Sequence, residues 1–242
     1  RVSTWQEWVE AELDAVRSAN RWRETVAFDG AGPLGRVGER DVVSFASNDY
    51  LGLAAHPDVR AAAIQALEQW GAGSSASRLV TGTRTLHHDL EAAIAQWKSA
   101  ERALVFPTGY AANLGALQVF SVAEATSFSD ELNHTSIIDG CRLAKARKAV
   151  FRHNDVEHLS ELLRQTSGLK IVVTEAAFSM DGDAAPLAEM QRLCMEHGAL
   201  LIVDEAHAVL TAMPQVEFDG YLRIGTLSKS LGALGGWVEG GR

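Results

Sequence analysis

Short apolar runs alternate along this chain with longer segments of helical periodicity. The apolar runs predict strands at 42–46, 103–106, 126–129, 149–151, 170–174, 199–203 and 222–226. The segments between them predict helices at 58–70, 85–98, 109–119, 135–147, 155–165 and 186–197, and apolar spacing from Trp5 to Val16 adds an N-terminal helix. Because strands that alternate with helices form βαβ units, we expect an α/β fold with a mostly parallel sheet flanked by helices.

The charge balance and the cysteine count narrow the classes of function. Of the 242 residues, 22 are Lys or Arg and 31 are Asp or Glu, which gives a net charge of −9. This balance disfavours a protein that neutralises nucleic-acid phosphates or docks on anionic membranes. No apolar run approaches the ~20 residues of a membrane span, and the two cysteines and scattered histidines indicate no metal site. We therefore expect a cytoplasmic protein that binds neither nucleic acid, nor membrane, nor metal.

Two segments look like nucleotide-binding motifs but lack the required context. The glycine-rich segment 71–76 (GAGSSA) matches a dinucleotide fingerprint, yet it follows a helical pattern rather than a strand, so we interpret it as a turn. The segment 200–207 (LLIVDEAH) resembles the acidic strand of a helicase. That interpretation requires a phosphate-binding G-x-x-x-x-G-K-[ST] loop, and the chain contains no Gly-Lys pair.

Lys229 stands apart from the other lysines of the chain. It is the only charged residue between Ile224 and Val238, and it follows a predicted strand. Burial in an uncharged pocket favours the neutral amine, which is the form that attacks carbonyl carbons. The alternative is a surface lysine whose apolar stem packs beside a loop.

Asp204 ends the most apolar predicted strand, where an unpaired carboxylate is costly. It is either the N-cap of a following helix or the partner of a buried cation. The ring nitrogen of pyridoxal 5'-phosphate (PLP) is such a cation, and the aldehyde of that cofactor requires a lysine. If Asp204 and Lys229 follow neighbouring strands, they would lie on opposite sides of one such ring.

Three further features fit a bound phosphorylated ring. Gly109 and Tyr110 open a predicted helix, whose free N–H groups can bind an anion. The hydroxyl of Thr226, close to Lys229 in sequence, could add a donor. His134 follows Asn133 in a polar stretch and is either a surface histidine or a flat ring that stacks on the cofactor.

Nine segments then carry a family resemblance in a common order: SFASNDYLGL (44–53), GAGSSASRLVTGT (71–83), LHHDLE (86–91), FPTGYAAN (106–113), DELNHTSIIDGCRLA (130–144), FRHNDVEHL (151–159), VVTEAAFSMDGDAAPLAEM (172–190), LLIVDEAH (200–207) and GTLSKSLGALGG (225–236). Together they resemble the α-oxoamine synthases, PLP-dependent enzymes of the aspartate-aminotransferase-like fold (fold type I).

The resemblance implies a role for each matching residue. Lys229 would hold the cofactor covalently and Asp204 would bind its pyridinium nitrogen. His207 would hydrogen-bond the phenolic oxygen, and His134 would stack on the ring. The remaining expected contacts are to the phosphate region (Gly109, Tyr110), to the cofactor (Thr226), to cofactor or substrate (Ser179) and to substrate carboxylates (Arg23, Asn48).

The chain looks most like the branch of this family that condenses L-alanine with pimeloyl-CoA in biotin biosynthesis. One alternative is a sister synthase that joins glycine to acetyl-CoA, and another is a non-catalytic partner subunit. The presence of Lys229 counts against a non-catalytic subunit. The resemblance also implies a homodimer that binds an amino acid and an acyl-CoA.

The same resemblance predicts the domain organisation. We expect an N-terminal helix and connecting segment at 1–40 and a PLP-binding large domain at 41–242. In the family a C-terminal small domain follows the large domain. Because this sequence stops soon after Lys229, we expect that small domain to be absent from it.

Overall fold

The computed structural model describes residues 3–211 and 219–241. The contacts divide the chain into two compact units, Arg1–Ala46 and Ser47–Arg242. No helix within the described ranges is both long enough and apolar enough to cross a membrane.

The first unit contains one helix and one hairpin. Helix α1 (Thr4–Ser18) begins where the Ser3 side chain accepts the N–H of Gln6. Strands β1 (Leu34–Val37) and β2 (Arg40–Val43) pair antiparallel around a two-residue turn. The turn begins at Gly38, whose φ of +60° suits such a tight reversal. The strand expected over 42–46 is confirmed only for residues 42 and 43, which lie in β2, and β2 pairs with β1 rather than with the large sheet.

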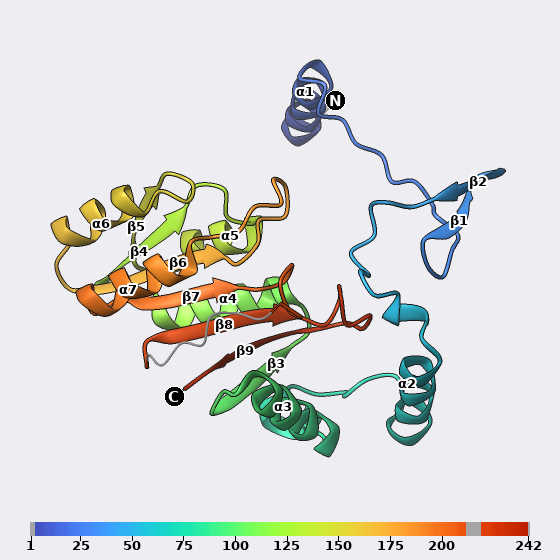
Figure 1. Ribbon diagram of the computed structural model, residues 1–242. Helices are drawn as coiled ribbons and strands as arrows, with labels where there is room; N and C mark the ends of the chain where they lie inside the picture. The colour runs from blue at the N-terminus through green and yellow to red at the C-terminus, as the bar shows by residue number, and fades with distance from the viewer. Residues whose placement is uncertain (1–2, 212–218, 242) are drawn as a thin grey trace. The chain divides into compact units, whose positions relative to one another are not determined.

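The second unit is built on a seven-stranded sheet of order β3-β9-β8-β7-β6-β4-β5 (Figure 1). Its strands are β3 (Arg102–Phe106), β4 (Ala125–Asp130), β5 (Arg147–Phe151), β6 (Leu169–Glu175), β7 (Leu200–Asp204), β8 (Tyr221–Thr226) and β9 (Gly236–Gly240). Strands β5, β4, β6, β7 and β8 run parallel, whereas β9 pairs antiparallel with both β3 and β8. The expected α/β fold with a mostly parallel sheet is confirmed.

The helical segments of this unit are η1 (Leu53–Ala55), α2 (Pro57–Trp70), η2 (Arg78–Gly82), α3 (Thr85–Lys98), α4 (Gly109–Phe120), α5 (Thr135–Leu143), α6 (Val156–Gln165) and α7 (Leu187–His197).

Two core clusters cover the two faces of the sheet. Helices α6 and α7 pack with Val172 and Val203 on one face, and α4 and α5 pack with Val173 and Ile202 on the other. The alternation of neighbouring residues between faces explains why these strands are apolar throughout.

The largest differences from the prediction concern one helix and one strand. The helix expected over 135–147 ends at Leu143, because Arg147–Phe151 pairs in register with Thr126–Asp130 of β4. Strand β9 is not among the predicted strands. Its residue Trp237 is fully buried and lies over Gly225 of β8, where a Cβ atom would come within 2.1 Å of the indole ring.

Candidate active site

Polar side chains gather where parallel strands end at the same edge of the sheet. Strand β6 ends at Glu175 and β7 ends at Asp204, and these two residues are paired in the strand register. Strand β8 is the other neighbour of β7, and Lys229 follows shortly after its last residue, Thr226. Asp204 and Lys229 thus stand at the ends of neighbouring strands.

A chain of hydrogen bonds runs from Lys229 to Asn48. The Lys229 Nζ atom lies 2.6 Å from His207 Nε2, and His207 Nδ1 lies 2.7 Å from the Tyr50 hydroxyl. The Tyr50 hydroxyl donates to Asn48 Oδ1 at 3.1 Å. These contacts fit a His207 ring that carries its proton on Nδ1 and accepts from the lysine at Nε2, an assignment made from the network.

Burial favours the neutral forms of Lys229 and His207 in this chain of hydrogen bonds. Desolvation lowers the pKa of Lys229, while the charges of Asp204 and Glu175 oppose that shift. Desolvation also lowers the pKa of His207, and the positive charge of Lys229 lowers it further. A neutral imidazole is the form that accepts a hydrogen bond from the lysine, so the geometry and the charges agree.

The Asp204 carboxylate accepts one local and one long-range hydrogen bond. Its Oδ1 atom accepts the N–H of Ala206 at 2.8 Å, which is a local turn contact. Its Oδ2 atom accepts from Asn113 Nδ2 at 2.6 Å, and both side chains are buried. Asn113 also donates to Ser136 at 3.0 Å, so helix α4 links the carboxylate to helix α5.

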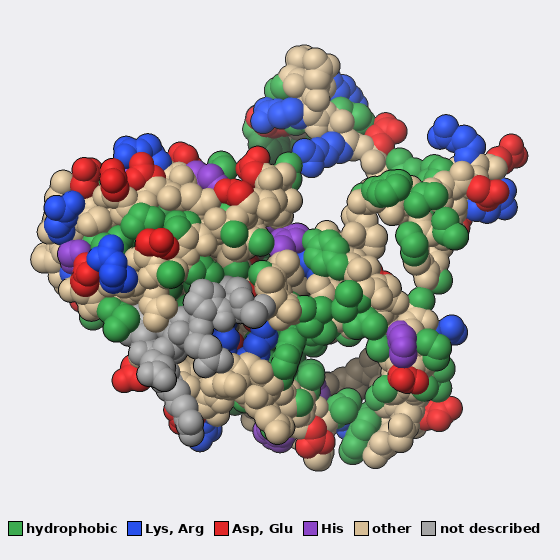
Figure 2. Space-filling model, in the orientation of Figure 1, with side chains coloured by type: hydrophobic (Ala, Val, Ile, Leu, Met, Phe, Trp, Pro, Cys, Tyr) green, Lys and Arg blue, Asp and Glu red, His purple; other side chains and the backbone are tan. Residues whose placement is uncertain are grey.

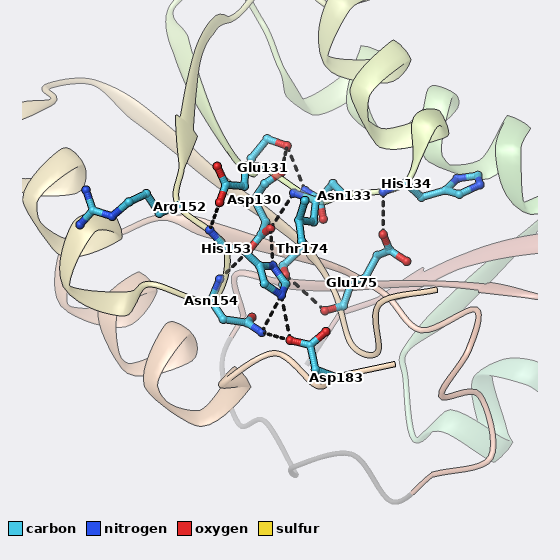
Figure 3. Close-up of polar contacts among 12 residues, drawn as sticks. Asp130, Glu131, Asn133, His134, Arg152, His153, Asn154, Thr174, Glu175 and Asp183 are labelled. Atoms are coloured by element: carbon cyan, nitrogen blue, oxygen red, sulfur yellow. Dashed lines mark hydrogen bonds and ion pairs between the residues drawn. The ribbon is translucent and has the colours of Figure 1, made fainter. Parts of the chain in front are cut away.

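His134 is joined to the same network from the N-terminus of α5. Its Nδ1 atom lies 2.7 Å from Ser136 Oγ, the hydroxyl that accepts from Asn113. Its backbone N–H donates to Glu175 Oε1 at 2.6 Å, as Figure 3 shows. The residues Asp204 and His134, far apart in sequence, are thus connected through two intermediate side chains.

Glu175 and Asn113 were not singled out from the sequence. Glu175 is 3% exposed, and its pKa is raised to about 7, first by burial and then by the charge of Asp204. The sequence does mark Glu175, because it ends an apolar strand just as Asp204 does. Asn113 has no comparable signal, since its role depends on where α4 packs.

The N-terminus of α4 offers a tight, donor-rich cradle. The Thr108 side chain caps the helix at the N–H of Ala111, and Gly109 follows it. A Cβ on Gly236 would lie 2.5 Å from the Gly109 nitrogen, and a Cβ on Gly109 would lie 3.3 Å from Thr226 Cβ. Only small residues fit this approach of backbone to backbone. The backbone N–H groups at this helix N-terminus are donors suited to an anion such as the PLP phosphate, whereas the neighbouring Thr226 hydroxyl donates to the Gly235 carbonyl at 3.0 Å.

Besides Thr226, three candidate residues are not joined to this network by a side-chain contact. The Tyr110 hydroxyl donates to Asp139 of α5 at 2.6 Å. Ser179 lies in the exposed turn after β6, where its backbone N–H bonds to Glu175. Arg23 is exposed and belongs to the first unit.

We expect Asn113→Ala to lower the free energy of unfolding by about 2 kcal/mol, because it leaves a buried carboxylate oxygen of Asp204 without its donor. Urea unfolding followed by tryptophan fluorescence measures this loss. The matched variant Ser136→Ala keeps the bond between Asn113 and Asp204 and is expected to cost less than half as much. Equal losses in the two variants would contradict the importance of that bond.

Comparison with known proteins identifies the family of this chain. Residues 40–240 match the family described as aminotransferase class I and II. The chain is 47% identical over 247 residues to 8-amino-7-oxononanoate synthase from Anaeromyxobacter sp. (strain K), covering 98% of this chain and 62% of that protein. It is 38% identical over 249 residues to 8-amino-7-oxononanoate synthase from Thermoanaerobacter pseudethanolicus, covering 98% of this chain and 63% of that protein.

A solved structure of a related enzyme has a similar fold. Serine palmitoyltransferase from S. paucimobilis with bound PLP–myriocin aldimine has a TM-score of 0.84 and 32% identity, covering 97% of this chain and 62% of that one. The chain therefore spans somewhat less than two thirds of the length of the relatives it matches. The resemblance to the α-oxoamine synthases is confirmed. With most of its length matched, the chain belongs to the aminotransferase class I and II family.

Proposed function

We propose that this protein is a PLP-dependent acyltransferase that condenses L-alanine with pimeloyl-CoA to 8-amino-7-oxononanoate, releasing coenzyme A and carbon dioxide. The observation that carries the proposal is the pairing of the half-buried Lys229 with a histidine 2.6 Å away, next to a strand that ends in a buried aspartate. The names of the similar proteins support the choice of reaction.

We propose that the residues gathered at the strand ends hold the cofactor. Lys229 would bind its aldehyde, Asp204 its ring nitrogen and His207 its phenolic oxygen, and His134 would cover the ring face. Gly109, Tyr110 and Thr226 would hold the phosphate region. When bound, the pyridine ring supplies an electron sink that stabilises negative charge on the substrate α-carbon.

The chain's own residues would then position and move protons. The lowered pKa of Lys229, caused first by burial, increases the fraction of neutral amine that can take the α-proton at Nζ. His207 Nε2 accepts from that nitrogen and fixes its direction. Asp204, fixed by the Asn113 side chain and the Ala206 N–H, would keep a proton on the ring nitrogen.

We propose substrate contacts for three more residues. Arg23 and Asn48 would bind substrate carboxylates, and Ser179 would contact cofactor or substrate. Asn48 is supported by its link through Tyr50 to His207. The proposal for Arg23 rests on the family resemblance.

A homodimer is part of this proposal. Helix α2 and the short helix η2 carry large exposed apolar side chains, among them Ile64, Leu67, Leu79 and Val80. Figure 2 shows hydrophobic side chains on the surface in the region of α2. A self-complementary contact would remove such side chains from water.

The test is release of coenzyme A by the full chain loaded with PLP. Three substrate pairs separate the alternatives: L-alanine with pimeloyl-CoA, glycine with acetyl-CoA, and L-serine with palmitoyl-CoA. We expect the highest kcat/KM for the first pair, with a product of the mass of 8-amino-7-oxononanoate. A higher kcat/KM for another pair would identify a sister synthase, and no release with any pair would favour a non-catalytic subunit.

A further inference from the structure

A second polar cluster joins three loops beside the candidate site (Figure 3). At its centre is His153, which lies in the connection between β5 and α6. Its Nδ1 atom is 2.9 Å from Asp130 Oδ1, and its Nε2 atom is 2.8 Å from Asp183 Oδ2. Asp130 is the last residue of β4, and Asp183 lies in the turn that follows β6. One imidazole ring therefore links the end of β4 to the turn that follows β6.

The neighbouring residue, Asn154, strengthens the same bridge. Its backbone N–H donates to Asp130 Oδ2 at 2.9 Å, and its side-chain nitrogen donates to Asp183 Oδ2 at 2.7 Å. Its φ of +55° is one that asparagine tolerates better than most residues. Both carboxylates thus receive donors from two consecutive residues.

The turn that carries Asp183 is closed and compact. The Phe178 N–H donates to the Asp183 carbonyl, and the Gly182 N–H donates to the Phe178 carbonyl, both at 2.9 Å. The Phe178 ring meets the His153 ring edge-on, with 4.4 Å between ring centroids. Whatever fixes Asp183 therefore fixes the whole turn, including Ser179.

This turn connects to the candidate site through Glu175. The buried Glu175 carboxylate accepts the backbone N–H of Ser179 and also that of His134. Asp130, the other partner of His153, is also connected to this region. It accepts the N–H of Leu132 at 2.9 Å, in the loop that leads to His134. His153 is thus tied to both loops that flank Glu175.

We propose that His153 is a positioning residue that clamps the Ser179 turn to the end of β4 and so fixes Ser179 and His134 around Glu175. The consequence for catalysis rests on the proposed function, whereas the clamp itself is a property of the folded chain.

The charges of the cluster determine when the clamp is strongest. A protonated ring donates to both Asp130 and Asp183, whereas a neutral ring donates to only one of them. Burial lowers the pKa of His153, but the hydrogen bonds to these two carboxylates outweigh it, and the pKa is raised. The other charged groups near the ring are Glu131, which accepts the His153 backbone N–H, and Arg152, which pairs with Asp155.

Hydrogen–deuterium exchange of the full chain without cofactor tests the clamp directly. We expect His153→Phe, which keeps an aromatic ring against Phe178, and Asp183→Asn to speed exchange in peptide 176–185 roughly tenfold, as loss of charge-assisted hydrogen bonds predicts. Asp181→Asn is the matched control, because this exposed carboxylate lies in the same turn. We expect it to change exchange less than twofold, a surface substitution effect.

Exchange in β7 shows whether each variant retains its fold. If β7 stays protected and the turn in His153→Phe exchanges at the wild-type rate, the proposal is overturned. It is also overturned if Asp181→Asn loosens the turn as much as Asp183→Asn does. Should His153→Phe unfold, the comparison of the two aspartate variants decides alone. Because no cofactor is present, these outcomes are independent of whether the proposed condensation occurs.

The sign of the pH dependence follows from the raised pKa of His153. The clamp is complete at pH below the ordinary histidine range and weakens as pH rises through the raised pKa. After correction for intrinsic exchange, the wild-type turn is expected to loosen with rising pH. In Asp183→Asn the midpoint should fall to lower pH, because one of the two stabilising carboxylates is gone. A midpoint unchanged by Asp183→Asn would argue against the bridge.

A kinetic comparison tests the consequence for catalysis. In the PLP-loaded enzyme we expect His153→Phe to lower kcat at least about tenfold while attachment of PLP at Lys229 stays complete, because misplaced groups slow chemistry without removing it. Asp181→Asn should retain wild-type kcat. A wild-type kcat in His153→Phe would show that the clamp does not contribute to catalysis.

Discussion

Lys229→Ala is expected to lower the rate of condensation by about four orders of magnitude or more, because it removes both the covalent anchor and the base. The structure makes this lysine difficult to replace. Its Nζ atom is held 2.6 Å from His207, and burial lowers its pKa. Lys229 is the only lysine among residues 227–242, which follow β8.

The matched control is Lys145→Ala, which removes an exposed lysine in the connection between α5 and β5. We expect its kcat/KM to stay within twofold of wild type. Coenzyme A release under saturating L-alanine measures both variants. A Lys229→Ala enzyme that retained a tenth of the wild-type rate would refute the role proposed for this residue.

Asp204→Asn is expected to slow condensation by roughly three orders of magnitude. The substitution preserves shape but removes the negative charge, and breaking a buried ion pair costs about 4 kcal/mol. Asp204 is buried, and its carboxylate is fixed by the contact with Asn113. Glu175, its register neighbour, is engaged by the backbone N–H groups of His134 and Ser179.

Loss of the Asp204 charge also changes the pKa of Lys229. The Asp204 carboxylate raises the pKa of Lys229, so Asp204→Asn should lower that pKa further. The acidic limb of the pH–rate profile should therefore shift to lower pH, a change that a merely unfolded variant would not show. The control Asp181→Asn should leave both the rate and the profile unchanged. A wild-type rate in Asp204→Asn would mean that no cation is bound there.

The alternation of strands and helices was predictable because it depends on local periodicity. The run at 170–174 lies within β6, the run at 199–203 overlaps β7 from Leu200 onward, and the pattern at 85–98 is α3. Strand β9 was missed because glycines begin and end it, and glycine-rich sequence favours turns. Its pairing depends on the contact between Trp237 and Gly225, which periodicity does not reveal.

The candidate site was predictable where a residue ends a strand. Asp204 and Lys229 were found in this way, and the same rule applied to Glu175 would have found it. Asn113 could not be predicted from the sequence, because its contact with Asp204 depends on the packing of α4. The bond from Tyr110 to Asp139 likewise depends on how α4 lies beside α5.

The central claim is that Lys229 is the residue that binds PLP. The most direct test incubates the full chain with PLP, reduces it with borohydride and locates the added phosphopyridoxyl group by peptide mass spectrometry. We predict close to one group per chain, carried by the peptide that contains Lys229. Label spread over Lys98, Lys145, Lys148 and Lys170, or no label at all, would contradict the account.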